Sequence, residues 1–169
     1  MTKTYSWDYD EWSEPRRWRR MAVAYIDASI HCFEGIAAGT LTQDFAQAQA
    51  ASFLFEHALE LFFKGAIAQA GLNPQGHHRL EEHHAQFRKL FPGKRFAFEG
   101  RIDEAVASDP LRPDSEYSRY PRDKKAQPWQ VNTHFDVPLW LAQLQIIRRD
   151  FERLLPRIEE RYPLSAPPN

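Results

Sequence analysis

The feature that most constrains this chain is a proline-free segment of 28 residues between Thr42 and Gly71. At about 1.5 Å of rise per residue, a helix of that length is roughly 42 Å long. Apolar residues recur along it at three- and four-residue steps: Phe45, Ala48, Ala51, Leu54, Phe55, Ala58, Leu61, Phe62, Ala66 and Ile67. An apolar stripe of this width predicts a central helix with neighbours on more than one side, and therefore a helical bundle.

Other segments show the same periodicity and have residues suited to helix ends. Helices are expected from about Pro15 to Ala38, from His78 to Phe91 and from Val137 to Tyr162, where Asp136 can serve as the N-cap. A short helix is also expected from Gly100 to Ser108. No segment has the pattern of a strand, so the sequence predicts an all-α fold, an antiparallel bundle of four or five helices.

The length of the chain fits one domain with short extensions. Residues 15–162 are expected to form the bundle, residues 1–14 an irregular N-terminal arm, and residues 163–169 a disordered tail that contains three prolines. Residues 109–135 contain four prolines and alternating charges, which predicts a long connection. Ordered connections of this length often carry functional residues.

The formal net charge of −1 gives the chain no global basic field, so nucleic-acid binding would need a local patch. The arginines at the start of the first helix could form such a patch, but acidic residues just upstream are the favoured partners for them: Arg16, Arg17, Arg19 and Arg20 beside Asp8, Asp10, Glu11 and Glu14. No uncharged apolar run reaches about 18 residues, and no signal peptide is recognisable. We therefore expect a cytoplasmic protein without a membrane span.

The central helix carries Glu56, Glu60 and Lys64 at successive four-residue steps, so the three side chains share one face. One interpretation is a solvated ion-pair ladder worth about 0.3–0.5 kcal/mol per pair. The other follows from the apolar residues around the row. Charges on so apolar a helix are expected to be partly buried, and buried charge rows often line a binding site.

The densest group of polar residues is Gly-His-His-Arg-Leu-Glu-Glu-His-His at positions 76–84. His77, Glu81 and His84 would share a face and could hold zinc only if the third helix already included His77. The spacings of known zinc motifs are absent, so a solvated polar face is expected instead. The sequence predicts neither a metal nor a cofactor. A separate hypothesis concerns Arg119 and Tyr120, whose guanidinium and ring suit phosphate and a stacked base.

The end of the central helix, with Glu-Leu-Phe-Phe-Lys-Gly-Ala-Ile, and the following Gly-His-His-Arg-Leu resemble HEPN domains. In that family the second long helix carries an acidic residue four positions before a lysine, and a His-x-Leu opens the third helix. Glu60, Lys64, His78 and Leu80 match this pattern in order and spacing. The segment Ser118–Pro121 is similar to an Arg-Tyr-Pro segment that many members carry before the final helix.

The resemblance implies an antiparallel helical bundle that is often a homodimer. Members include RNase toxins, toxin–antitoxin and antiphage components, and nucleotide-binding modules. The RNase members use an arginine, four to six further residues and a histidine near the start of the final helix. This chain departs from that pattern because Arg119 is followed only fifteen residues later by His134, whereas Arg79 and His84 have the spacing on the third helix.

The expected function is therefore a non-catalytic HEPN-like module that binds a nucleotide, RNA or a protein partner. In this hypothesis Lys64 and Arg119 meet phosphate, Tyr120 stacks on a base, His78 orients one of them, and Glu60 holds Lys64. Two alternatives stay open. One is a metal-independent RNase toxin that uses Arg79 with His84, or Arg119 with His134. The other is a structural helical interaction subunit without a small ligand.

Overall fold

The computed structural model describes residues 13–41, 45–102 and 136–163. Its elements are α1 (Glu14–Ala37), α2 (Phe45–Gln69), α3 (Leu80–Leu90), the 3-10 helix η2 (Lys94–Phe96) and α5 (Val137–Arg161). The described residues contain no strand, which confirms the all-α prediction. No helix in this part of the chain is long and apolar enough to cross a bilayer.

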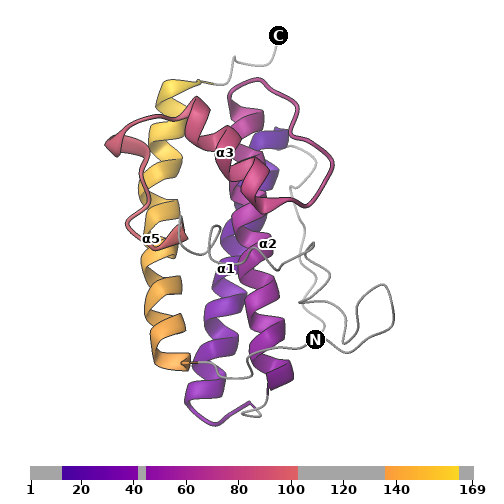
Figure 1. Cartoon of the computed structure of the whole chain (residues 1–169), viewed down its shortest axis with the longest axis vertical. Coiled ribbons are helices and arrows are strands. Elements are labelled where there is room, and N and C mark those ends of the chain that lie inside the picture. The colour runs from indigo at the N-terminus through magenta and orange to yellow at the C-terminus, as the bar shows by residue number, and fades with distance from the viewer. Residues whose placement is uncertain (1–12, 42–44, 103–135, 164–169) are drawn as a thin grey trace, which may run out of the picture.

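The three long helices lie side by side, and α3 crosses α2 near the end of the bundle where α5 finishes (Figure 1). α1 runs antiparallel to both α2 and α5, as its contacts with α5 also show. Arg19 near the start of α1 pairs with Glu159 near the end of α5, and Asp27 farther along α1 pairs with Arg148. α2 contacts α1, α3 and α5, so the central position predicted for it is correct.

The helix ends follow the sequence signals closely except at α3. Asp136 caps α5 as predicted, since its carboxylate accepts a hydrogen bond of 3.0 Å from the backbone N–H of Leu139. α3 begins at Leu80 rather than His78, because Arg79 at its N-cap position is extended. His77 therefore lies outside the helix, which removes the geometry on which a zinc site with Glu81 and His84 depended.

The core is aromatic where α2 meets α3 and α5. The ring of Phe62 stacks on Phe151 of α5 at 4.3 Å, and the ring of Phe63 packs 5.3 Å from Phe87 of α3. All four side chains are fully buried. Each buried aromatic side chain contributes roughly 2–3 kcal/mol of transfer free energy, so these contacts fix α2 between its neighbours.

The close contact between α1 and α2 depends on Gly65. A Cβ on Gly65 would lie 3.0 Å from the Trp18 Cβ and 3.1 Å from the Arg19 Cγ, so the absent side chain lets α1 approach α2. Arg19 is thereby buried at 6% exposure, and its carboxylate partner among the described residues is Glu159 at 2.9 Å. Of the upstream acids that the sequence offers as partners, Asp8, Asp10 and Glu11 lie outside the described residues. Burial lowers the pKa of the Arg19 guanidinium, although Glu159 acts in the opposite direction.

A buried carboxylate fastens the segment after η2 to α5. Asp150 is 1% exposed and accepts hydrogen bonds of 2.9 Å from the backbone N–H groups of Glu99 and Gly100. The Arg153 guanidinium also pairs with the Asp150 carboxylate. A Cβ on Gly100 would lie 2.4 Å from the Ile147 Cγ1, so the chain passes over α5 at a distance only glycine permits.

Asp150→Ala should therefore lower the free energy of unfolding by about 2–4 kcal/mol, because two backbone donors lose their acceptor and Arg153 loses one of its carboxylate partners. Chemical denaturation measures the loss. The exposed neighbour Arg149 supplies the control, since Arg149→Ala should change stability by less than about 0.5 kcal/mol. Equal effects of the two substitutions would contradict the role assigned to Asp150.

Candidate functional site

The candidate site is built around the Glu60 carboxylate on α2, which is only 5% exposed. Lys64, one helical turn later and equally buried, donates to Glu60 Oε1 at 2.6 Å. The predicted charge row is therefore not a solvated ladder at these two positions. A buried carboxylate and ammonium in direct contact stabilise each other, and removing either leaves an uncompensated charge inside the protein.

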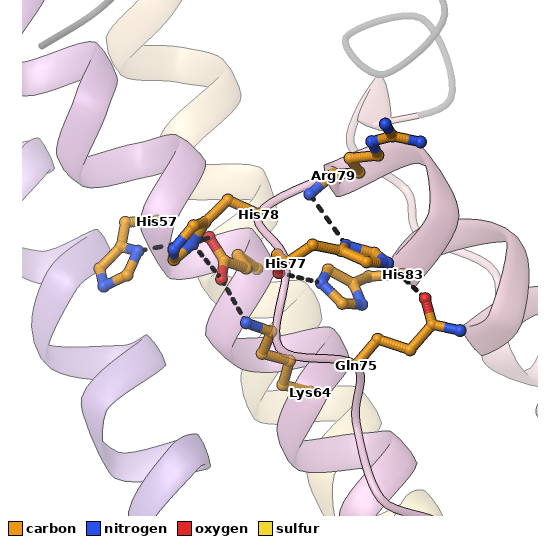
Figure 2. Close-up of polar contacts among 8 residues, drawn as sticks. His57, Lys64, Gln75, His77, His78, Arg79 and His83 are labelled. Carbon is orange, nitrogen blue, oxygen red and sulfur yellow. Dashed lines mark hydrogen bonds and ion pairs between the residues drawn. The ribbon is translucent and has the colours of Figure 1, made fainter. Parts of the chain in front are cut away.

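The turn between α2 and α3 brings His78 to the same carboxylate. Its Nδ1 lies 2.9 Å from Oε1 and 3.2 Å from Oε2 of Glu60 (Figure 2). Because a carboxylate only accepts, Nδ1 must carry the proton, and in the neutral ring Nε2 then has the lone pair. The His78 side chain is 50% exposed, so Glu60 holds a half-exposed imidazole in one tautomer and one orientation.

A second imidazole approaches Glu60 from its own helix. The Nδ1 atom of His57 is 3.5 Å from Glu60 Oε2, an electrostatic contact longer than a good hydrogen bond. Its ring meets the edge of Tyr25 of α1 at 4.7 Å and stacks near Phe53 at 5.9 Å. Nδ1 is buried without a hydrogen bond, so the nearby Glu60 carboxylate is its main electrostatic partner.

These neighbours determine the charge of Glu60. Burial by itself raises the pKa of this carboxyl, but the contacts with His57, Lys64 and His78 outweigh it and lower the pKa from 4.5 to about 2. The carboxylate is therefore ionised throughout the physiological range. Lys64 also faces the ring of Trp18 on α1, with its Nζ 5.8 Å from the ring centroid, so the cluster connects three elements of the fold.

His83 of α3 keeps the turn in place behind the cluster. Its Nε2 donates a hydrogen bond of 3.0 Å to the carbonyl oxygen of His77, and its ring stacks on the His77 ring at 4.8 Å. His83 is 1% exposed. Burial lowers its pKa and the Lys64 charge acts in the same direction against the hydrogen bond to His77, so the neutral ring is favoured. A neutral, buried His83 thus fixes the backbone next to His78.

Three of the five residues predicted to form the site come together: Glu60, Lys64 and His78. Arg119 and Tyr120 lie outside the described residues, as does His134. In the described ranges no group of three or more acidic, histidine or cysteine side chains could hold a metal ion. Sequence reasoning overlooked His57, although its position three residues before Glu60 on a helix was a usable signal.

Arg79 and His84, which have the spacing of the RNase motif, are engaged elsewhere. The Arg79 guanidinium donates to Glu82 at 2.8 Å, and the His84 ring packs 5.2 Å from the buried ring of Phe63. No protein-family model matches the sequence, and neither a curated protein nor a solved structure is significantly similar to it. The geometry of the described residues is therefore the basis for a functional assignment.

The depressed pKa of Glu60 predicts a pH-dependent contribution to stability. A fall from 4.5 to about 2 corresponds to about 3 kcal/mol, present above pH 4.5 and lost as the pH falls toward 2. Glu60→Gln should therefore be less stable than the native protein at pH 7, and about 2 kcal/mol of this difference should be gone at pH 3. Urea unfolding of both proteins at pH 7, 4.5 and 3 measures it, and a difference that stays constant would show that Glu60 is not held as described.

Proposed function

We propose that the chain is a HEPN-like, non-catalytic binding module whose Glu60–Lys64–His78 cluster receives the phosphate group of a nucleotide or RNA. One observation carries the proposal. Three of the residues on which the resemblance rests, Glu60, Lys64 and His78, span 18 positions and meet at one carboxylate, and His78 is left half-exposed. A side chain oriented by a buried ion pair is prepared to bind a ligand with little loss of conformational entropy.

The chemistry next to His78 suits an anion. When protonated, the ring keeps its Nδ1–H on Glu60 and offers Nε2–H outward as a charged donor. α3 begins two residues later, so its unpaired N–H groups and the positive end of its dipole lie on the same stretch of chain. Arg79 is exposed beside it, and its pairing with Glu82 is a surface contact of low energy.

In this proposal Lys64 does not contact the phosphate directly. Its ammonium is buried against Glu60, where it keeps the carboxylate ionised and the two groups neutral together. Contact with the ligand then falls to His78, with Arg119 and Tyr120 still the predicted contacts from residues 109–135. A toxin–antitoxin or antiphage system, with a homodimer or a protein partner, is the setting that the resemblance implies.

The test is a thermal-shift panel of ATP, other nucleotides, short RNA and zinc. A nucleotide or RNA at 100 times its dissociation constant should stabilise the native protein by about 2.7 kcal/mol. His78→Gln should weaken that ligand by about tenfold, because a charge-assisted hydrogen bond is lost. His31→Gln is the matched control, since its side chain is 89% exposed and belongs to α1, outside the cluster.

Three results would redirect the assignment. Equal affinity in His78→Gln and His31→Gln would place the ligand away from the Glu60 cluster. RNA cleavage without metal that disappears in His84→Ala or His134→Ala would instead establish the ribonuclease alternative. A panel without any nucleotide or RNA shift would leave a helical interaction subunit, which size-exclusion chromatography with light scattering would then examine for a dimer.

A further inference from the structure

A cleft of about 300 Å³ lies at the end of the bundle, where η2 meets the last turn of α5. It shares no residue with the Glu60 cluster, and its lining consists of Pro92, Arg95, Phe96, Glu160 and Arg161. Phe96 is 4% exposed and packs on Phe91 at 5.3 Å, which gives the cleft a rigid aromatic base. The cleft is therefore built on the core rather than on surface side chains alone.

Two guanidinium groups stand over that aromatic base. The Cζ atoms of Arg95 and Arg161 lie 5.9 and 5.6 Å from the centroid of the Phe96 ring, and Arg161 is also 5.6 Å from the Tyr162 centroid. Glu160 pairs with Arg95. Among the described residues no carboxylate pairs with Arg161, so the ring contacts hold this cation in place without neutralising it.

Further cations stand just before the lining residues Pro92 and Arg95 in the sequence. Arg88 and Lys89 occupy the last turn of α3, and Lys94 opens η2. All three are exposed, and none pairs with a carboxylate in the part of the chain that the structure describes. Together with Arg161 they make four cations that have no carboxylate partner among the described residues, in a protein whose formal net charge is −1.

The helix dipoles offset only part of this positive charge. The C-terminal end of a helix carries the equivalent of about −0.5 charge, so the ends of α3 and α5 together offset about one of the four cations. The described cations therefore outnumber the charge of the two helix ends, which suits a ligand with more than one negative charge. Guanidinium forks match phosphate oxygens in geometry, and a single carboxylate would neutralise too little.

We infer that this cleft is a second anion site, which binds the phosphate group of a phosphate ester through Arg161, with Lys94, the residue before Arg95 of the lining, as a second cation. The ligand is either a free phosphate monoester or the backbone of a single-stranded nucleic acid. Both present the same oxygens to the same guanidinium, and the site is independent of the Glu60 cluster.

Fluorescence anisotropy of a labelled oligouridylate, measured on the full chain over a range of salt concentrations, tests the inference. Arg161→Gln should weaken binding about tenfold and reduce the slope of log affinity against log salt by about 0.7. Arg149→Gln is the matched control: Arg149 lies on the same helix, is also exposed, and its substitution removes the same charge. Lys94→Gln should act in the same direction as Arg161→Gln.

Competition by inorganic phosphate or adenosine monophosphate would identify a site for a single phosphate, whereas competition by unlabelled oligonucleotide alone would identify the phosphodiester backbone. Equal binding by Arg161→Gln and Arg149→Gln overturns the inference, as does the absence of any phosphate or oligonucleotide binding. A loss in His78→Gln without one in Arg161→Gln assigns the binding to the Glu60 cluster and also overturns it. A loss in Arg161→Gln supports the cleft whatever His78→Gln does, which separates this test from that of the proposed function.

Discussion

The rest of the site depends on the contacts that the buried Glu60 carboxylate makes. It binds Lys64 at 2.6 Å within α2 and His78 at 2.9 Å across the turn. It also lies 3.5 Å from the Nδ1 atom of His57. An ionised carboxylate is tolerated at 5% exposure only because positive and hydrogen-bonding groups surround it. The same requirement fixes the position of the turn and thereby the start of α3, which packs its own aromatic residue, Phe87, against α2.

The sequence predicts the features that depend on residues close together in the chain, and misses those that depend on distant residues. Periodicity located the long helices to within a few residues, and Asp136 was recognisable as a cap because its partner, Leu139, lies three residues on. The start of α3 was placed too early because His78 fits a helical pattern locally, whereas its side chain bonds to Glu60, 18 residues away. A distant partner of this kind leaves no periodic signal.

The candidate site shows the same difference between contacts of near and distant residues. The pairing of Glu60 with Lys64 is an interaction between residues four apart and was predictable; its burial was expected from the apolar neighbours. The approach of His78 was suggested by the family resemblance, not by spacing. Arg19 with Glu159, and Asp150 with the backbone after η2, join residues 50 or more positions apart, so only the folded structure reveals them. The cleft likewise joins distant residues, since its Arg95 and Glu160 are 65 positions apart.

The contact with Glu60 requires His78 to be in the tautomer with the proton on Nδ1. Two-bond ¹H–¹⁵N correlation spectra of the imidazole, recorded at a pH where the ring is neutral, observe this directly. The comparison is Glu60→Leu combined with Lys64→Met, which removes both buried charges together and leaves neither unpaired. We expect Nδ1–H with a deprotonated Nε2 in the native protein and loss of that preference in the double variant. A native His78 protonated on Nε2 alone would contradict it.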